Sequence, residues 1–416
     1  MKIDDRIPDG MGNGTLPDHA SIKTPWEKLI SFFDAYHYGL RHNAGLGALF
    51  FEVMRILIPD YEKRMERMAG LNYNIFYQTF ASGFNKVHAG NHNVPPFVKG
   101  AMTAPLFGDS GDERLCMHGR VNDYGTYRVE KELDNCPFEI QGTEVCRLSA
   151  LITEAIGDSF CQTGPEADEH KLKFIMSEAR GAGDLHCRFI IESREKYPAD
   201  DKPMWNAFEP AASLDQVQYT PEEKMVKEPQ EFRGECDYKY RNGFNMESNA
   251  TDQFRFGATN FILGANYVLP TIDDMIKKGE TTQEEVENIF QCVFAGAGKM
   301  MFTEFFAAKG LRDWLGVPEG LNDGRVLGAY IEVLLQIWMG EYKVIAFNKD
   351  EVVYDITKLG GREHAHPLCA HAIISMWYGM ARTLVGQRWF CERIREGVDE
   401  KTIRVKISKK IDKFAR

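Results

Sequence analysis

The sequence lacks any long, uninterrupted apolar segment. Its most apolar stretches run from Leu46 to Ile58 and from Val326 to Met339, and charged residues interrupt both of them. Neither reaches the roughly 20 apolar residues that a membrane-spanning helix requires. The stretch Met1 to Arg6 also lacks the basic start and apolar run of a secretory signal. We therefore expect a cytoplasmic protein with no membrane partner.

The chain is also short of positive charge. It carries 50 lysine and arginine residues against 61 aspartate and glutamate residues, which gives a net charge of −11 and a pI near 5.6. No stretch combines clustered basic residues with interleaved aromatic residues. Because nucleic-acid binding depends on basic side chains that neutralise phosphates, this composition argues against a nucleic-acid partner.

Several familiar catalytic and binding motifs are absent. No Walker A, GxSxG, HExxH or EF-hand pattern occurs, and Gly45-Leu46-Gly47 lacks the third glycine of a dinucleotide-binding fingerprint. The nine cysteines are odd in number, are dispersed along the chain and include no CxxC pair. This usage argues against a disulfide framework and predicts reduced thiols.

What the chain does contain is enough apolar sequence for packed cores. With 416 residues and 44% hydrophobic residues, two or three domains are expected. We place one domain at residues 1–194, a polar linker at 195–253 and a second domain at 254–416. Apolar periodicity predicts an α+β fold. Helices are expected at 25–40, 46–58, 60–84, 144–156, 254–278, 282–309, 322–339 and 368–385, and strands at 124–129, 172–176, 186–192, 343–346, 352–356 and 402–407. Thr281-Thr282 followed by Glu284-Glu285 predicts a cap for the helix that begins at 282.

The two halves of the chain share five short landmarks in the same order. The pairs are Tyr127-x-Val129 with Tyr354-x-Ile356, Cys136-Pro137-Phe138 with His366-Pro367-Leu368, Gly157 with Gly386, Phe160-Cys161 with Phe390-Cys391, and Arg188 to Ile191 with Arg404 to Ile407. Matched order and spacing predict a tandem duplication. Each copy should consist of helices followed by a small antiparallel sheet with a packed helix. The second copy is degenerate, because it lacks the Gly-Asp-x-His-Cys turn of residues 183–187.

The densest set of reactive side chains lies in the first half. Cys146 is expected in the first turn of a helix, where the helix dipole favours a thiolate and lowers the thiol pKa. Cys146 or Cys187 would be a nucleophile or a metal ligand, with an acid or a histidine transferring protons. A tetrahedral zinc site is one interpretation of the set. In the other, two cysteines face the core one helix apart and never meet. The set comprises Glu144, Cys146, Cys161, Asp184, His186 and Cys187.

A second run of potential ligands lies in the second half. His364-x-His366-Pro367-Leu368-Cys369-x-His371 holds four soft or borderline ligands. Such a run can bind zinc or iron, so His366, Cys369 and His371 are candidate metal ligands. The alternative is a loop whose histidines cap the following helix, since ligands so close in sequence seldom reach one tetrahedral centre unaided.

These residues resemble a known superfamily. Cys136-Pro137-Phe138, Glu144-Val145-Cys146 and Gly183-Asp184-Leu185-His186-Cys187 resemble 4-vinyl-reductase-like domains and the related L-2-amino-thiazoline-4-carboxylate hydrolase-like proteins. The run His364 to Cys369 resembles the matching region of aromatic-effector sensor domains in that superfamily. The resemblance covers residues 120–190 and 340–410. It implies an α+β unit around an apolar pocket, in some members with a zinc ion held by one glutamate and three cysteines.

The implied zinc ligands are matched only in part. Cys146 and Cys187 stand where two cysteine ligands would be, but Ala179 stands at the position of the third. Cys161 or His186 would have to substitute for it. In the second copy Cys369 alone matches.

Two functions therefore remain open. The first is a hydrolase or lyase that acts on a cyclic or aromatic-derived small molecule, with zinc, iron or no cofactor. The second is a ligand- or redox-sensing module without catalysis. A small-molecule substrate is the expected partner, and a homodimer is an open alternative to a monomer.

Overall fold

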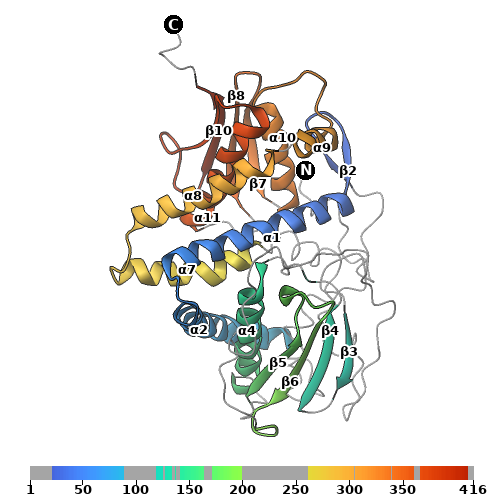
Figure 1. Cartoon of the computed structure of the whole chain (residues 1–416), viewed down its shortest axis with the longest axis vertical. Helices are drawn as coiled ribbons and strands as arrows, with labels where there is room; N and C mark the ends of the chain where they lie inside the picture. Colours follow the sequence, from blue (N-terminus) through green and yellow to red (C-terminus); the bar gives the residue numbers. More distant parts are fainter. Residues whose placement is uncertain are drawn as a thin grey trace. The chain divides into compact units, whose positions relative to one another are not determined.

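In the described part of the chain, two four-stranded antiparallel sheets form the β structure together with one short hairpin (Figure 1). With the surrounding helices they make an α+β protein, as the sequence predicts. The computed structural model describes residues 21–88, 119–124, 127–133, 136, 141–163, 171–198, 261–303, 305–338, 340–359 and 366–410.

The two sheets have the same topology. The first has the strand order β3-β4-β6-β5 and the second has the order β7-β8-β10-β9. In each sheet one helix, α4 or α11, connects the second strand to the third. The first set is β3 (Gly119–Tyr124), β4 (Arg128–Leu133), α4 (Thr143–Thr163), β5 (Leu172–Glu178) and β6 (Cys187–Ser193). The second set is β7 (Glu341–Phe347), β8 (Glu351–Lys358), α11 (Pro367–Met380), β9 (Trp389–Ile394) and β10 (Ile403–Lys409).

The shared order agrees with the predicted repeat, but individual landmarks do not coincide. Phe189 of β6 pairs with Lys131 of β4, whereas Val405 of β10 pairs with Tyr354 of β8. If the last strands are aligned as their sequences suggest, Tyr354 therefore corresponds to Lys131 and not to Tyr127. Gly157 and Gly386 also differ, since the first lies inside α4 and the second follows the helical segment. Descent of the two predicted copies from one ancestor stays a prediction.

The beginning of the described chain is a hairpin where a helix starting at Pro25 was expected. The hairpin is closed by the Thr24 amide, which donates to the Lys28 carbonyl at 2.9 Å. The aromatic spacing after Pro25 suits a helix, but the first helical turn begins only beyond the hairpin. The following helix then runs without the predicted interruption. The elements are β1 (Ser21–Lys23), β2 (Leu29–Ser31), α1 (Phe32–Leu57) and α2 (Tyr61–His88).

The helices before the second sheet follow the predicted pattern with one break. The expected helix at 282–309 is two helices, separated near Phe302. The predicted cap is confirmed, because the Glu285 amide donates to Thr282 Oγ1 at 3.2 Å and the Thr282 amide donates to Glu285 Oε2 at 2.9 Å. These helices are α7 (Phe261–Lys277), α8 (Gln283–Met301), α9 (Phe305–Leu315) and α10 (Arg325–Ile337).

Two strand predictions need correction. Residues 124–129 are not one strand, because β3 ends at Tyr124 and β4 begins at Arg128. Strand β9 was not predicted at all. It follows a π-helical turn at Ala381–Val385 that extends α11.

The chain divides into two compact units. In its described part, unit 1 comprises residues 21–43 and 272–410, and unit 2 comprises residues within 44–271. Helices α1 and α7 each contribute residues to both units. Unit 1 contains the second sheet and unit 2 contains the first.

The core of unit 1 depends on close helix packing. Helix α10 is buried except at Arg325 and Glu332. Helices α8 and α11 approach so closely that a Cβ at Gly298 would lie 2.1 Å from the Met376 carbonyl oxygen. Even so, none of the helices that the structure describes is long and apolar enough to cross a membrane.

Candidate functional site

Helix α4 carries Glu144 and Cys146 near its start, and two carboxylates near its end fix it to strand β5. Glu154 Oε1 accepts the Phe174 amide and Asp158 Oδ1 accepts the Leu172 amide, each at 2.7 Å. Four helical residues rise about 6 Å and two strand residues about 6.6 Å, so the two spacings match. Because β5 is an outer strand, these contacts also pair amides at the edge of the sheet.

The two carboxylates are nearly inaccessible to solvent. Burial is the main reason that the pKa of Glu154 rises to about 7, and it also raises the pKa of Asp158. Arg194 opposes the rise at Glu154 by donating to Oε2 at 3.0 Å. The Tyr73 hydroxyl donates to Asp158 Oδ2 at 2.6 Å. These contacts give both carboxylates structural roles in holding α4.

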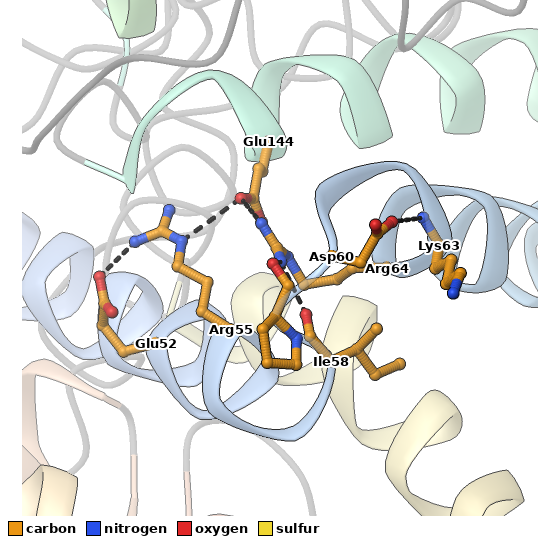
Figure 2. Close-up of polar contacts among 8 residues, drawn as sticks. Glu52, Arg55, Ile58, Asp60, Lys63, Arg64 and Glu144 are labelled. Atoms are coloured by element: carbon orange, nitrogen blue, oxygen red, sulfur yellow. Dashed lines mark hydrogen bonds and ion pairs between the residues drawn. The ribbon is translucent and has the colours of Figure 1, made fainter.

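Glu144, a predicted proton-transfer group, is buried in a cluster of ion pairs (Figure 2). Arg64 of α2 donates to Glu144 Oε1 at 2.7 Å and to Oε2 at 3.3 Å. Arg55 of α1 donates to Oε1 at 3.3 Å and is itself paired with Glu52. Arg64 also donates to the Ile58 carbonyl at 2.7 Å, where α1 ends. Glu144 therefore joins the starts of α2 and α4 to the end of α1.

The same region is rich in guanidinium groups. Arg147 is 1% exposed and lies over the ring of Tyr61, with its Cζ atom 5.3 Å from the ring centroid. Arg64 lies over the same ring at 5.6 Å. Cation–π contacts of this kind are favourable, and more so when the cation is desolvated. The cluster at the start of α4 therefore combines three arginines (Arg55, Arg64 and Arg147) with two glutamates (Glu52 and Glu144).

Cys146 and Cys187, the two strongest candidates, contact the same short turn. Cys146 is the fourth residue of α4 and is 6% exposed. A Cβ at Gly181 would lie 2.6 Å from Cys146 Sγ, so the thiol packs directly against the glycine backbone. The Arg180 amide donates to Cys187 Sγ at 3.3 Å. The turn at Arg180–Ala182 therefore brings the two predicted thiols to adjacent residues.

A buried tyrosine lies close to this site. The hydroxyl of Tyr267 is 3.2 Å from Ser149 Oγ, and Ser149 follows Cys146 by about one helical turn. Burial raises the pKa of Tyr267, and the neighbouring thiols Cys146 and Cys136 raise it further. The tyrosine therefore stays protonated and is available as a hydrogen-bond donor. Sequence inspection missed Tyr267, because no motif links it to the cysteines.

Asp184 and His186 lie in the segment that joins the turn to β6. Asp184 Oδ2 accepts the Ala179 amide at 2.8 Å, so this carboxylate stabilises the turn. His186 is half-buried, and its Nδ1 lies 3.8 Å from Glu132 Oε1. Glu132 is buried and also accepts from Arg188 at 3.0 Å. Asp184 therefore has a backbone partner, whereas His186 lies beside the titratable side chain of Glu132.

The candidate residues of unit 1 have different partners. His366 is the N-cap of α11: its Nδ1 accepts the Leu368 amide at 3.2 Å, and its Nε2 lies 3.0 Å from Asp273 Oδ2. His371 Nε2 lies 3.0 Å from the Glu287 carbonyl oxygen. His366 therefore caps the helix, as the alternative interpretation predicted. Cys369 is buried in the first turn of the same helix.

The metal prediction gains no geometric support. Within the part of the chain that the structure covers, no three His, Cys, Asp or Glu residues gather as a metal site would require. Glu144 is occupied by arginines, and the two histidines face different helices. The side chain of Cys161 and all of His364 lie outside the described residues. We derive no step through zinc or iron, and binding of either stays a prediction.

One further buried polar group precedes α4. Gln141 is 1% exposed, and neither end of its carboxamide has a hydrogen-bond partner among the residues described. Gly142 follows with a φ of 85°, a left-handed conformation that favours glycine, and α4 then begins. The Gly142 carbonyl oxygen lies 3.2 Å from the Cβ position of Gly181, the glycine that Cys146 contacts.

Comparison with known proteins adds no relative. The chain matches no protein-family model, no curated protein and no solved structure.

Proposed function

We propose that the protein is a cytoplasmic hydrolase or lyase that acts on a cyclic or aromatic-derived small molecule through Cys146. The observation that carries the proposal is the position of this thiol. It lies in the first turn of α4, beside the bare backbone of Gly181. A helix start favours the thiolate, which is the nucleophilic form of cysteine.

The chemistry proposed is that of a cysteine nucleophile. For a cyclic amide, Cys146 Sγ would attack the carbonyl carbon and the ring carbon–nitrogen bond would break. The leaving nitrogen would take a proton, and water would then cleave the thioester and restore the thiol. Because Glu144 is committed to Arg64, Asp184 and His186 remain the predicted candidates for proton transfer, and His186 Nδ1 lies 3.8 Å from Glu132 Oε1.

The alternative is a ligand- or redox-sensing module, and one observation favours it. Cys146 and Cys187 contact adjacent residues of the same turn, so oxidation of either thiol would disturb Arg180 and Gly181. A sensor would bind small molecules or change its thiol state without turnover.

The test is turnover against cyclic amides, thiazolines and alicyclic diketones by wild type, Cys146→Ser and Cys391→Ser. Cys391 is a matched control because it is buried in unit 1, where burial raises its pKa. We expect Cys146→Ser to abolish turnover and Cys391→Ser to retain it. Equal activity of the two variants would contradict the proposal, and tight binding without turnover by wild type would favour the sensor.

A further inference from the structure

The carboxamide of Gln141 is an unusual group to bury. Amide hydrogen-bonding groups taken out of water without partners are costly, so native cores rarely contain them. Here Nε2 and Oε1 are both inaccessible, and both lack partners in the described part of unit 2. Such a group is more readily explained by a ligand than by folding, since a methionine would fill a similar space at less cost.

The position of this carboxamide is fixed by close packing. A Cβ at Gly47 would lie 2.4 Å from Gln141 Oε1 and 2.5 Å from Nε2. The near-equal distances mean that the flat face of the amide lies on the backbone of α1. A Cβ at Gly264 would in turn lie 2.8 Å from the Gly47 Cα, so α7 supports α1 from another side. The amide therefore has little freedom to rotate.

The sequence Gln141-Gly142-Thr143 then leads directly into α4. The Gly142 carbonyl oxygen and Cys146 Sγ both lie against the Cβ position of Gly181, so the residue after Gln141 contacts the same glycine as the candidate nucleophile. A fixed carboxamide presents one donor and one acceptor side by side. The complementary partner is a group with an acceptor next to a donor, as in a lactam or a cyclic amidine.

We infer that Gln141 is a specificity-determining residue that binds the amide or amidine edge of a cyclic substrate through paired hydrogen bonds. This inference rests on the proposed function, because it deepens the substrate class of the Cys146 site. In the bound state Nε2 donates to the carbonyl oxygen or imine nitrogen of the substrate. Oε1 accepts the adjacent N–H.

The experiment compares binding of 2-pyridone with binding of N-methyl-2-pyridone, which has lost the donor. Calorimetry should show that wild type prefers 2-pyridone by about tenfold or more, since one hydrogen bond in a buried site is worth about that factor. Gln141→Met should abolish the preference. It should also raise the melting temperature, because it removes an unpaired buried amide. Gln336→Met, at a buried glutamine of unit 1, should leave the preference unchanged.

The outcomes separate this inference from the proposed function. If Gln141→Met keeps the preference or lowers the melting temperature, the amide has a structural role and the inference is wrong. Absence of any preference in wild type also overturns it. If Cys146→Ser retains turnover while the preference still depends on Gln141, the nucleophile is wrong and the recognition residue stands. If turnover depends on Cys146 but Gln141→Met keeps the wild-type kcat/KM, the nucleophile stands and Gln141 is not the recognition residue.

Discussion

Replacement of Gly157 by alanine sets two known effects against each other. In an exposed helix, glycine to alanine stabilises a protein by about 0.5–1 kcal/mol. At Gly157, however, the new Cβ would lie 2.1 Å from Leu172 Cδ2, and Leu172 is fully buried. Overpacking of this kind costs about 1–3 kcal/mol. Displacing α4 would also stretch the 2.7 Å bonds from β5 to Glu154 and Asp158. We expect a net destabilisation of about 1–2 kcal/mol or more.

The matched control is Gly70→Ala, in the exposed part of α2, where no atom lies within 4 Å of the new Cβ. Gly70→Ala should therefore show only the stabilisation of about 0.5–1 kcal/mol that alanine gives an exposed helix. Hydrogen exchange of the Leu172 amide is the direct assay, because this amide reports on the contact between α4 and β5. We expect faster exchange in Gly157→Ala and equal or slower exchange in Gly70→Ala. The same sign of change in both variants would refute the packing argument.

Three further predictions concern buried ionisable side chains. Burial lowers the pKa of His42 from 6.5 to about 4, so its contribution to unit 1 is present above pH 6.5 and is lost as the pH falls to 4. His42→Phe should remove up to about 3 kcal/mol of this acid sensitivity, measured by urea unfolding followed by tryptophan fluorescence. Glu154 behaves in the opposite sense, because its raised pKa of about 7 makes unit 2 lose stability as the pH rises from 4.5 to 7. Glu154→Gln should flatten that dependence in hydrogen-exchange measurements, and an unchanged slope would contradict the assignment. Arg64→Met should lower the free energy of unfolding by about 3–5 kcal/mol, because Glu144 loses its main partner. An unchanged free energy in chemical unfolding would show that Arg55 alone compensates the charge of Glu144.

Local sequence signals predicted much of the fold. The cap at Thr282 was predictable because both of its partners lie within one turn. Strands β5, β6 and β10 were predictable from alternation, but β9 was missed. The hairpin before Phe32 was also missed, because the aromatic spacing there fits a helix as well. The order of strands within each sheet was not predictable, because β9 was missed and the landmarks Tyr127 and Tyr354 do not occupy equivalent positions.

The candidate site was predictable only in part. The structure places Cys146 against Gly181, a contact between segments that are distant in sequence and that no local pattern predicts. The role of Glu144 was not predictable, because its partner Arg64 lies 80 residues away in sequence. Gln141 carries no motif, and its missing partners become visible only when the surrounding backbone is known.

The central claim is that Cys146 is a thiolate nucleophile in the folded protein. The most direct measurement is the ultraviolet absorbance of thiolate at neutral pH, taken as the difference between wild type and Cys146→Ser. The same difference for Cys391→Ser gives the baseline of a buried, protonated thiol, since burial raises the pKa of Cys391. We predict a thiolate signal from Cys146 and none from Cys391. Equal differences at neutral pH, with a signal from Cys146 only on unfolding in alkali, would contradict the account.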